Sequence, residues 1–175
     1  MRKLEKKALI VSSFAGYADD IGRFLWCLED VRTKLLTELT GISQASLDRR
    51  LGERQSIGSL LYHIALIEAD WLYVDLLGTE WDPEISSLFP VDNKTEDQLS
   101  HFEGESLEQH MYRLAKVREQ LLSHFRSMDL NQWRKPRVLE NYEVTPEWVV
   151  YHLIEHESNH RGQIFQSLRE LRIES

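Results

Sequence analysis

The stretch at residues 145–171, "TPEWVVYHLIEHESNHRGQIFQSLREL", decides the fold because it predicts one long amphipathic helix. Thr145 is a favourable N-cap residue, and Pro146 fits the first turn, where its missing N–H costs no hydrogen bond. Val149, Leu153 and Ile164 fall on one face when successive residues are turned by about 100°. A helix with such a face must bury it against other elements.

Three earlier stretches predict partner helices of similar length. The first covers residues 17–39 and ends near Gly41. The second follows the N-cap residue Ser56 and runs to Gly78. The third covers residues 106–128, with Ser106 as its expected N-cap. The stripe of the first helix has apolar residues at spacings of three and four, namely Ile21, Leu25, Leu28, Val31, Leu35 and Leu36.

The connections between these stretches complete the predicted architecture. Residues 79–105 form a long polar connection with two prolines, which we interpret as a crossover that lets the second and third helices run parallel. Residues 131–144 are more extended and suggest a short hairpin. We therefore predict one all-α domain over residues 1–175, a four-helix bundle with a long connection between its second and third helices.

Composition excludes several classes of function. A chain of 175 residues with 42% hydrophobic residues can build one core. Its 29 acidic and 21 basic residues give a formal charge of -8, which disfavours nucleic acid as a partner. The single cysteine, Cys27, cannot form an internal disulfide, and the apolar run in "KKALIV" is too short to cross a membrane. We expect a cytoplasmic protein.

Three histidines on the 145–171 helix suggest a metal site. His156 and His160 lie within the apolar stripe, and a buried imidazole without a partner costs about 1–3 kcal/mol. Histidines four residues apart can converge on one ion, but His152 and His160 are separated by about 12 Å of helix rise. One of the three is therefore not a ligand.

A third ligand is then expected from another helix, because a catalytic zinc-type site uses three protein ligands and keeps one position open. His63 is the candidate, since it shares the inward stripe of the second helix with Leu60, Ile67, Val74 and Leu77. Asp70, on the same stripe but about 10 Å along, is a weaker candidate. Cys27 would close the site as a fourth ligand if it faced the ion.

Two other interpretations compete with a metal centre of this kind. A core histidine such as His63 is often only a hydrogen-bonded residue. "HESNH" at residues 156–160 also matches the zinc-protease pattern HExxH, but those proteases have mixed folds and this chain has little strand pattern. Gln163 returns to the histidine face and is expected to hydrogen-bond a ligand ring or a substrate.

The segments "IGRFLWCLEDVRTKLL", "SIGSLLYHIALIEADWLY" and "EWVVYHLIEHESNHRGQI" resemble the DinB-like, or YfiT-like, superfamily of small bacterial helical bundles. The resemblance covers residues 17–171. It implies a divalent metal ion, zinc or nickel, held by His63, His156 and His160. His152 then lies outside the triad and is expected to line the pocket or to pack beside Trp148.

The resemblance also implies two classes of function. Relatives include a thiol-dependent isomerase and S-transferases that use bacillithiol or mycothiol, so the site is expected to activate a thiol or water against a small-molecule substrate. The alternative is a non-enzymatic metal-binding bundle with a structural or ligand-sensing role. Members of the family commonly form homodimers, and we expect the same here.

Overall fold

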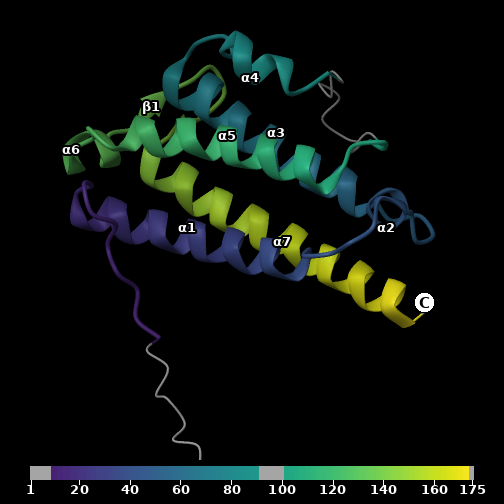
Figure 1. Ribbon diagram of the computed structural model, residues 1–175. Helices are drawn as coiled ribbons and strands as arrows, with labels where there is room; N and C mark the ends of the chain where they lie inside the picture. Colours follow the sequence, from purple (N-terminus) through teal and green to yellow (C-terminus); the bar gives the residue numbers. More distant parts are fainter. Residues whose placement is uncertain (1–8, 91–100, 174–175) are drawn as a thin grey trace, which may run out of the picture.

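The computed structural model describes residues 9–90 and 101–173, which are mostly helical (Figure 1). The long helical segments in this part are α1 (Asp19–Glu38), α3 (Ile57–Asp70) continued by the π-helix η1 (Trp71–Leu77), α5 (Leu107–Phe125) and α7 (Pro146–Ile173). The connections contain α2 (Gln44–Asp48), α4 (Pro83–Ser87), α6 (Leu130–Arg134) and the strands β1 (Arg137–Val138) and β2 (Glu143–Val144). The predicted all-α class is confirmed.

The predicted caps set the helix starts. The Ser56 and Ser106 hydroxyls accept hydrogen bonds from the backbone N–H groups three residues on, and Thr145 accepts one from the N–H of Trp148 at 3.1 Å. Each bond satisfies a donor that the first turn would leave unpaired. Gly78 ends η1 with a φ of 64°, a conformation that favours glycine.

The helices run in two opposed pairs. Near its start, α3 meets α5 where Gly58 faces His110, and near its end the two helices meet again where Glu68 pairs with Arg118, so they are parallel. The colours in Figure 1 show α3 and α5 running one way and α1 and α7 the other. The connection of residues 79–105 is therefore the crossover that was predicted. Its residues 91–100 lie outside the described part.

Arg113 of α5 holds both ends of that connection. Its Nε donates to the carbonyl of Leu88 at 2.7 Å, and its Nη2 pairs with Glu105 at 2.5 Å. The guanidinium carbon lies 4.6 Å from the ring centroid of Tyr62 and 5.5 Å from that of Phe102, a cation–π arrangement. One buried side chain thus ties the crossover to α3 and α5.

The second predicted helix differs from the structure in its last two turns. We expected Val74 and Leu77 to point inward, but they are 48% and 40% exposed, whereas Leu72 and Leu76 are buried. The cause is the change from α3 to η1 at Trp71, because each π-helical hydrogen bond spans one residue more and turns the buried face.

The hairpin was predicted and α6 was not. β1 and β2 pair antiparallel, with Arg137 opposite Val144. The segment before them, interpreted as extended, instead forms one helical turn that Asp129 and Gln132 cap reciprocally. This turn buries Trp133 completely against the bundle.

The core consists of two apolar clusters, one toward each end of the bundle. One contains Ile21, Leu25, Leu28, Leu72, Leu121 and Val149, among others. The other contains Leu35, Leu60, Ile64, Leu114, Ile164 and Leu168, among others. In the part of the chain that the structure describes, every helix is too short or too polar to span a lipid bilayer.

Candidate metal centre

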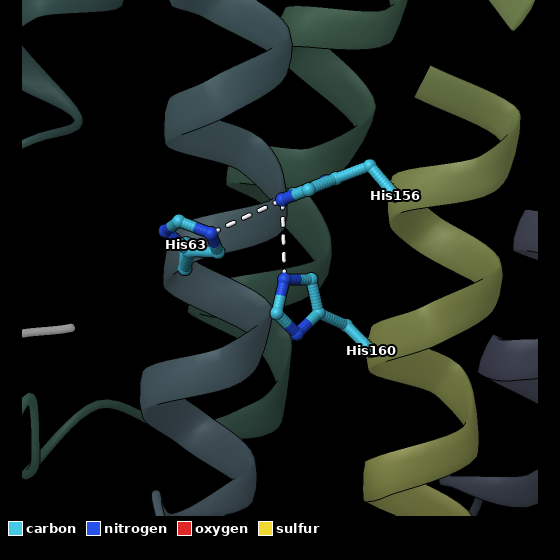
Figure 2. Close-up of side chains that lie close together, drawn as sticks. All are labelled: His63, His156 and His160. Atoms are coloured by element: carbon cyan, nitrogen blue, oxygen red, sulfur yellow. Dashed lines mark hydrogen bonds between the residues drawn. The ribbon is translucent and has the colours of Figure 1, made fainter. Parts of the chain in front are cut away.

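Three imidazoles converge in the space between α3 and α7. His63 comes from α3, and His156 and His160 come from successive turns of α7 (Figure 2). The Nε2 atom of His156 lies 3.1 Å from the Nε2 atoms of both His63 and His160. The facing atoms of all three lie within 4.8 Å of one another. The structure therefore brings together the three side chains that the sequence had singled out.

This spacing fits a metal ion. Tetrahedral ligands with bonds of about 2.0–2.1 Å are separated by about 3.3 Å. The two measured Nε2 separations of 3.1 Å are close to that value. Among the described histidine, cysteine, aspartate and glutamate side chains, no fourth one joins the cluster. Asp70 is exposed and Cys27 half-buried, and neither belongs to it.

Gln163 fixes the proton on His160. The Nδ1 of His160 lies 3.1 Å from the Gln163 side-chain oxygen, which can only accept, so Nδ1 carries the proton and Nε2 presents a lone pair. Only one of the two contacts at His156 Nε2 can then be an ordinary hydrogen bond. A cation among the three nitrogens would satisfy all of them. Gln163 thus contacts a ring of the histidine triad, as was expected.

Burial keeps the triad neutral. It lowers the pKa of His63 to about 4, with a further contribution from the charge of His160. It lowers the pKa of His156 to about 3, helped by the charges of His160, His63 and His152. Burial also lowers the pKa of His160, although the hydrogen bond to Gln163 opposes this. Metal binding requires the neutral form, which these pKa values favour near pH 7.

The fourth histidine of this region, His152, lies outside the triad. Its ring stacks on Trp148, with centroids 5.0 Å apart and planes 4° from parallel. The sequence-based argument from helix rise had excluded one of the three α7 histidines as a ligand, and His152 is the one that lies outside the three-histidine cluster. It packs beside Trp148, as was expected.

Glu157 distinguishes "HESNH" from a zinc-protease motif. In such proteases the glutamate after the first histidine is a general base beside the metal. Here its carboxylate is 1% exposed and binds two arginines in the bundle interior, Arg32 at 2.6 Å and Arg118 at 3.0 Å. It is not available as a base.

These arginines belong to a buried charged layer, which we define as Arg32, Glu68, Arg118 and Glu157, one residue from each of α1, α3, α5 and α7. Arg32 and Arg118 each pair with both glutamates. Burial alone would raise the pKa of Glu68, but the charges of Arg118 and Arg32 and their hydrogen bonds hold it below its ordinary value. The layer lies between the two apolar clusters, and sequence analysis missed it.

The metal-free protein is expected to lose stability as the pH falls from about 6.5 to 4. Histidines in the unfolded chain titrate near pH 6.5. The folded protein protonates His63 only at about pH 4 and His156 only at about pH 3. Between these values the unfolded state binds more protons, so the free energy of unfolding decreases with falling pH. Urea midpoints in the presence of a chelator at pH 7.5 and 5 measure this.

The control for this prediction is the double variant His63→Gln/His156→Gln. It lacks two groups that take up protons on unfolding, so its midpoint should fall less between the two pH values. His110, whose pKa burial lowers to about 4, remains in both proteins and gives a common background. Equal losses in the wild type and the variant would contradict the assignment.

Comparison with known proteins places this site in a family. No curated protein matches the chain. A solved structure described as a conserved protein from Enterococcus faecalis is similar in fold, with a TM-score of 0.68 and 15% identity over 82% of this chain and 91% of that one. The family model of the DinB superfamily matches residues 28–164, which include His63, His156 and His160. The chain therefore belongs to the DinB superfamily.

Proposed function

We propose that this protein is a metal-dependent enzyme in which His63, His156 and His160 hold a divalent ion, zinc or nickel. The observation that carries the proposal is the convergence of three Nε2 atoms without a fourth described protein ligand beside them. Catalytic zinc sites use three protein ligands and leave a position for water or substrate, whereas structural sites use four.

The chain's own residues prepare this site. The lowered pKa values of His63 and His156 keep both imidazoles neutral and able to bind a cation at neutral pH. Gln163 orients the ring of His160 through Nδ1. An ion held there would act as a Lewis acid that lowers the pKa of a thiol or of water. A low-molecular-weight thiol or water is therefore the proposed nucleophile, and the reaction is an S-transfer or a hydrolysis.

The position of the triad also favours a second candidate, a metal that only stabilises the bundle. His63 lies on α3 and the other two histidines on α7, so one ion would link two helices that are otherwise joined by packing and by the charged layer. Such a protein would bind metal without turnover. The homodimer and the cytoplasmic location stay predictions from the sequence.

The test has two stages. Elemental analysis of protein purified without an affinity tag should find close to one zinc or nickel per chain, and His156→Ala should lose it. Metal-loaded protein is then screened with bacillithiol and other thiols against an aryl halide, and with water alone against an activated ester. Thiol-dependent turnover that His156→Ala lacks supports the transferase, and thiol-independent turnover supports the hydrolase. Stoichiometric metal without turnover would favour the structural role.

A further inference from the structure

The triad continues into a row of aromatic side chains. On α7, Trp148, His152, His156 and His160 follow one another at intervals of four residues, which places them along one face of the helix. Trp71 stands at the start of η1, opposite Trp148 and His152, because α3 and α7 are antiparallel. The row extends about 12 Å from His156 to Trp148 at the usual helical rise.

Each ring of this row lies in contact with the next one along it. The His152 centroid lies 6.0 Å from that of His156 and 5.0 Å from that of Trp148. Trp71 lies 5.1 Å from His152 and 5.4 Å from Trp148, and Tyr142 of the hairpin lies 6.3 Å from Trp71. We call Trp71, Tyr142, Trp148 and His152 the aromatic wall. It begins one ring away from the triad.

The aromatic wall is accessible and held in place. Trp148 is 45% exposed and Tyr142 47% exposed, so large ring surfaces face outward at the end of the row away from the triad. The Tyr142 hydroxyl donates to the buried carboxylate of Asp75, which fixes the hairpin against η1. Core tryptophans and tyrosines are normally covered, and exposed aromatic surface at a site is typical of ligand binding.

Acidic side chains stand beside the wall. Burial raises the pKa of Tyr142 to about 12, with further contributions from Asp75 and Asp70, and Glu155 opposes the burial that lowers the pKa of His152. Arg161, which follows His160 on α7, has its guanidinium carbon 6.0 Å from the ring centroid of Phe165 and lines a groove with α1. A ligand with a carboxylate or phosphate at this end would bring negative charge toward carboxylates.

We propose that the aromatic wall binds an aromatic, uncharged or cationic end of the substrate while the reacting group lies at the histidine triad. This inference rests on the proposed function and names its substrate class. The His152 ring follows the triad and Trp148 stacks on it, about 12 Å of helix rise from His156, so a ring about five bonds away from the reacting group would reach Trp148. Stacking on such surfaces contributes to affinity, and aromatic faces also attract cations.

Calorimetric titration of the zinc-loaded protein with hydroxamates tests the inference. The probes are acetohydroxamate, 5-phenylpentanohydroxamate, whose chain is long enough to bring its ring to Trp148, and the latter with a para-carboxamide or a para-carboxylate. The phenyl probe should bind more tightly than acetohydroxamate, and Trp148→Ala should reduce this advantage about three- to tenfold. Trp148→Phe should retain most of it. The carboxylate should bind more weakly than the carboxamide.

The matched control is Tyr151→Ala, which removes an aromatic ring of α7 that is 50% exposed and lies about 100° around the helix from His152, on the side away from the histidine triad. It should leave the phenyl advantage unchanged. If the phenyl probe kept the same advantage over acetohydroxamate in the wild type and in all variants, this inference would be overturned while the proposed function would stand. If the protein binds neither zinc nor acetohydroxamate, the proposed function fails and the inference fails with it.

A homodimer interface is the rival role for the same surface. Sedimentation of the wild type and Trp148→Ala at equal concentration decides this. If Trp148→Ala converts a dimer to a monomer, the wall is an interface and the inference is overturned. An unchanged mass, together with the lost phenyl advantage, supports a substrate site.

Discussion

Replacing Glu157 with alanine should lower the free energy of unfolding by about 3–5 kcal/mol, the usual cost of removing one partner from a buried ion pair. The carboxylate accepts from Arg32 Nε at 2.6 Å and from Arg118 Nη2 at 3.0 Å, and all three side chains are at most 5% exposed. Without Glu157 the two arginines share Glu68, with Glu29 as a further partner of Arg118. Urea unfolding of the metal-free protein at pH 7.5 measures the change.

Glu155→Ala is the matched control. Glu155 directly precedes His156 on α7 and is exposed, so its removal should change the free energy of unfolding by no more than about 0.5 kcal/mol. A loss below about 1 kcal/mol for Glu157→Ala would contradict the role of the charged layer. It would mean that water replaces the carboxylate between Arg32 and Arg118.

The long helices could be predicted because local signals define them. Ser56, Ser106 and Thr145 cap helices in the structure as their side chains predicted, and Gly78 ends one. Such signals act within a few residues and need no tertiary context. The π-helix η1 could not be predicted this way, because its register follows from packing. Extending α-helical geometry past Asp70 therefore placed Val74 and Leu77 on the wrong face.

The histidine triad could be predicted in part. Helix rise excluded one of the three α7 histidines, and an inward stripe indicated His63, but only the fold brings residue 63 within 3.1 Å of residue 156. The family resemblance supplied that pairing before the structure did.

The charged layer was missed although the sequence carries a signal for it. Arg32 follows Leu28 by four residues and precedes Leu35 by three, so it lies on the apolar stripe of α1. Arg118 stands in the same relation to Leu114 and Leu121 on α5. A charge at such a position is rarely buried alone, so two of them predict acidic partners on neighbouring helices. Which glutamates those are depends on helix pairing.

The aromatic wall was also missed, although its spacing is visible in the sequence. Tryptophans usually pack in cores and interfaces, so the presence of Trp148 in the sequence does not by itself indicate a ligand site. Trp148 and His152 extend the four-residue interval of His156 and His160 backward along α7. This spacing indicates a ligand surface only when Trp71 and Tyr142 lie beside it, and these two residues come from η1 and from the hairpin.

Zinc should raise the melting temperature of the wild type by about 5–10 °C, and His156→Ala should abolish this rise. A ligand at 100 times its Kd adds about 2.7 kcal/mol to the free energy of unfolding. For a chain of this size each kcal/mol corresponds to about 2–4 °C. We expect His156 to be the most sensitive position because its Nε2 lies 3.1 Å from the Nε2 atoms of both other histidines of the triad. Thermal unfolding with and without zinc, and with nickel in parallel, measures the rise.

His152→Ala separates metal binding from general damage to α7. His152 lies one turn from His156 on the same helix, with ring centroids 6.0 Å apart, but does not belong to the three-histidine cluster. Its removal takes away the stack on Trp148 and should lower the melting temperature of the metal-free protein, yet the rise with zinc should persist. If His152→Ala abolished the rise and His156→Ala preserved it, the ligand assignment would be wrong. The family resemblance would then have excluded the wrong histidine of α7.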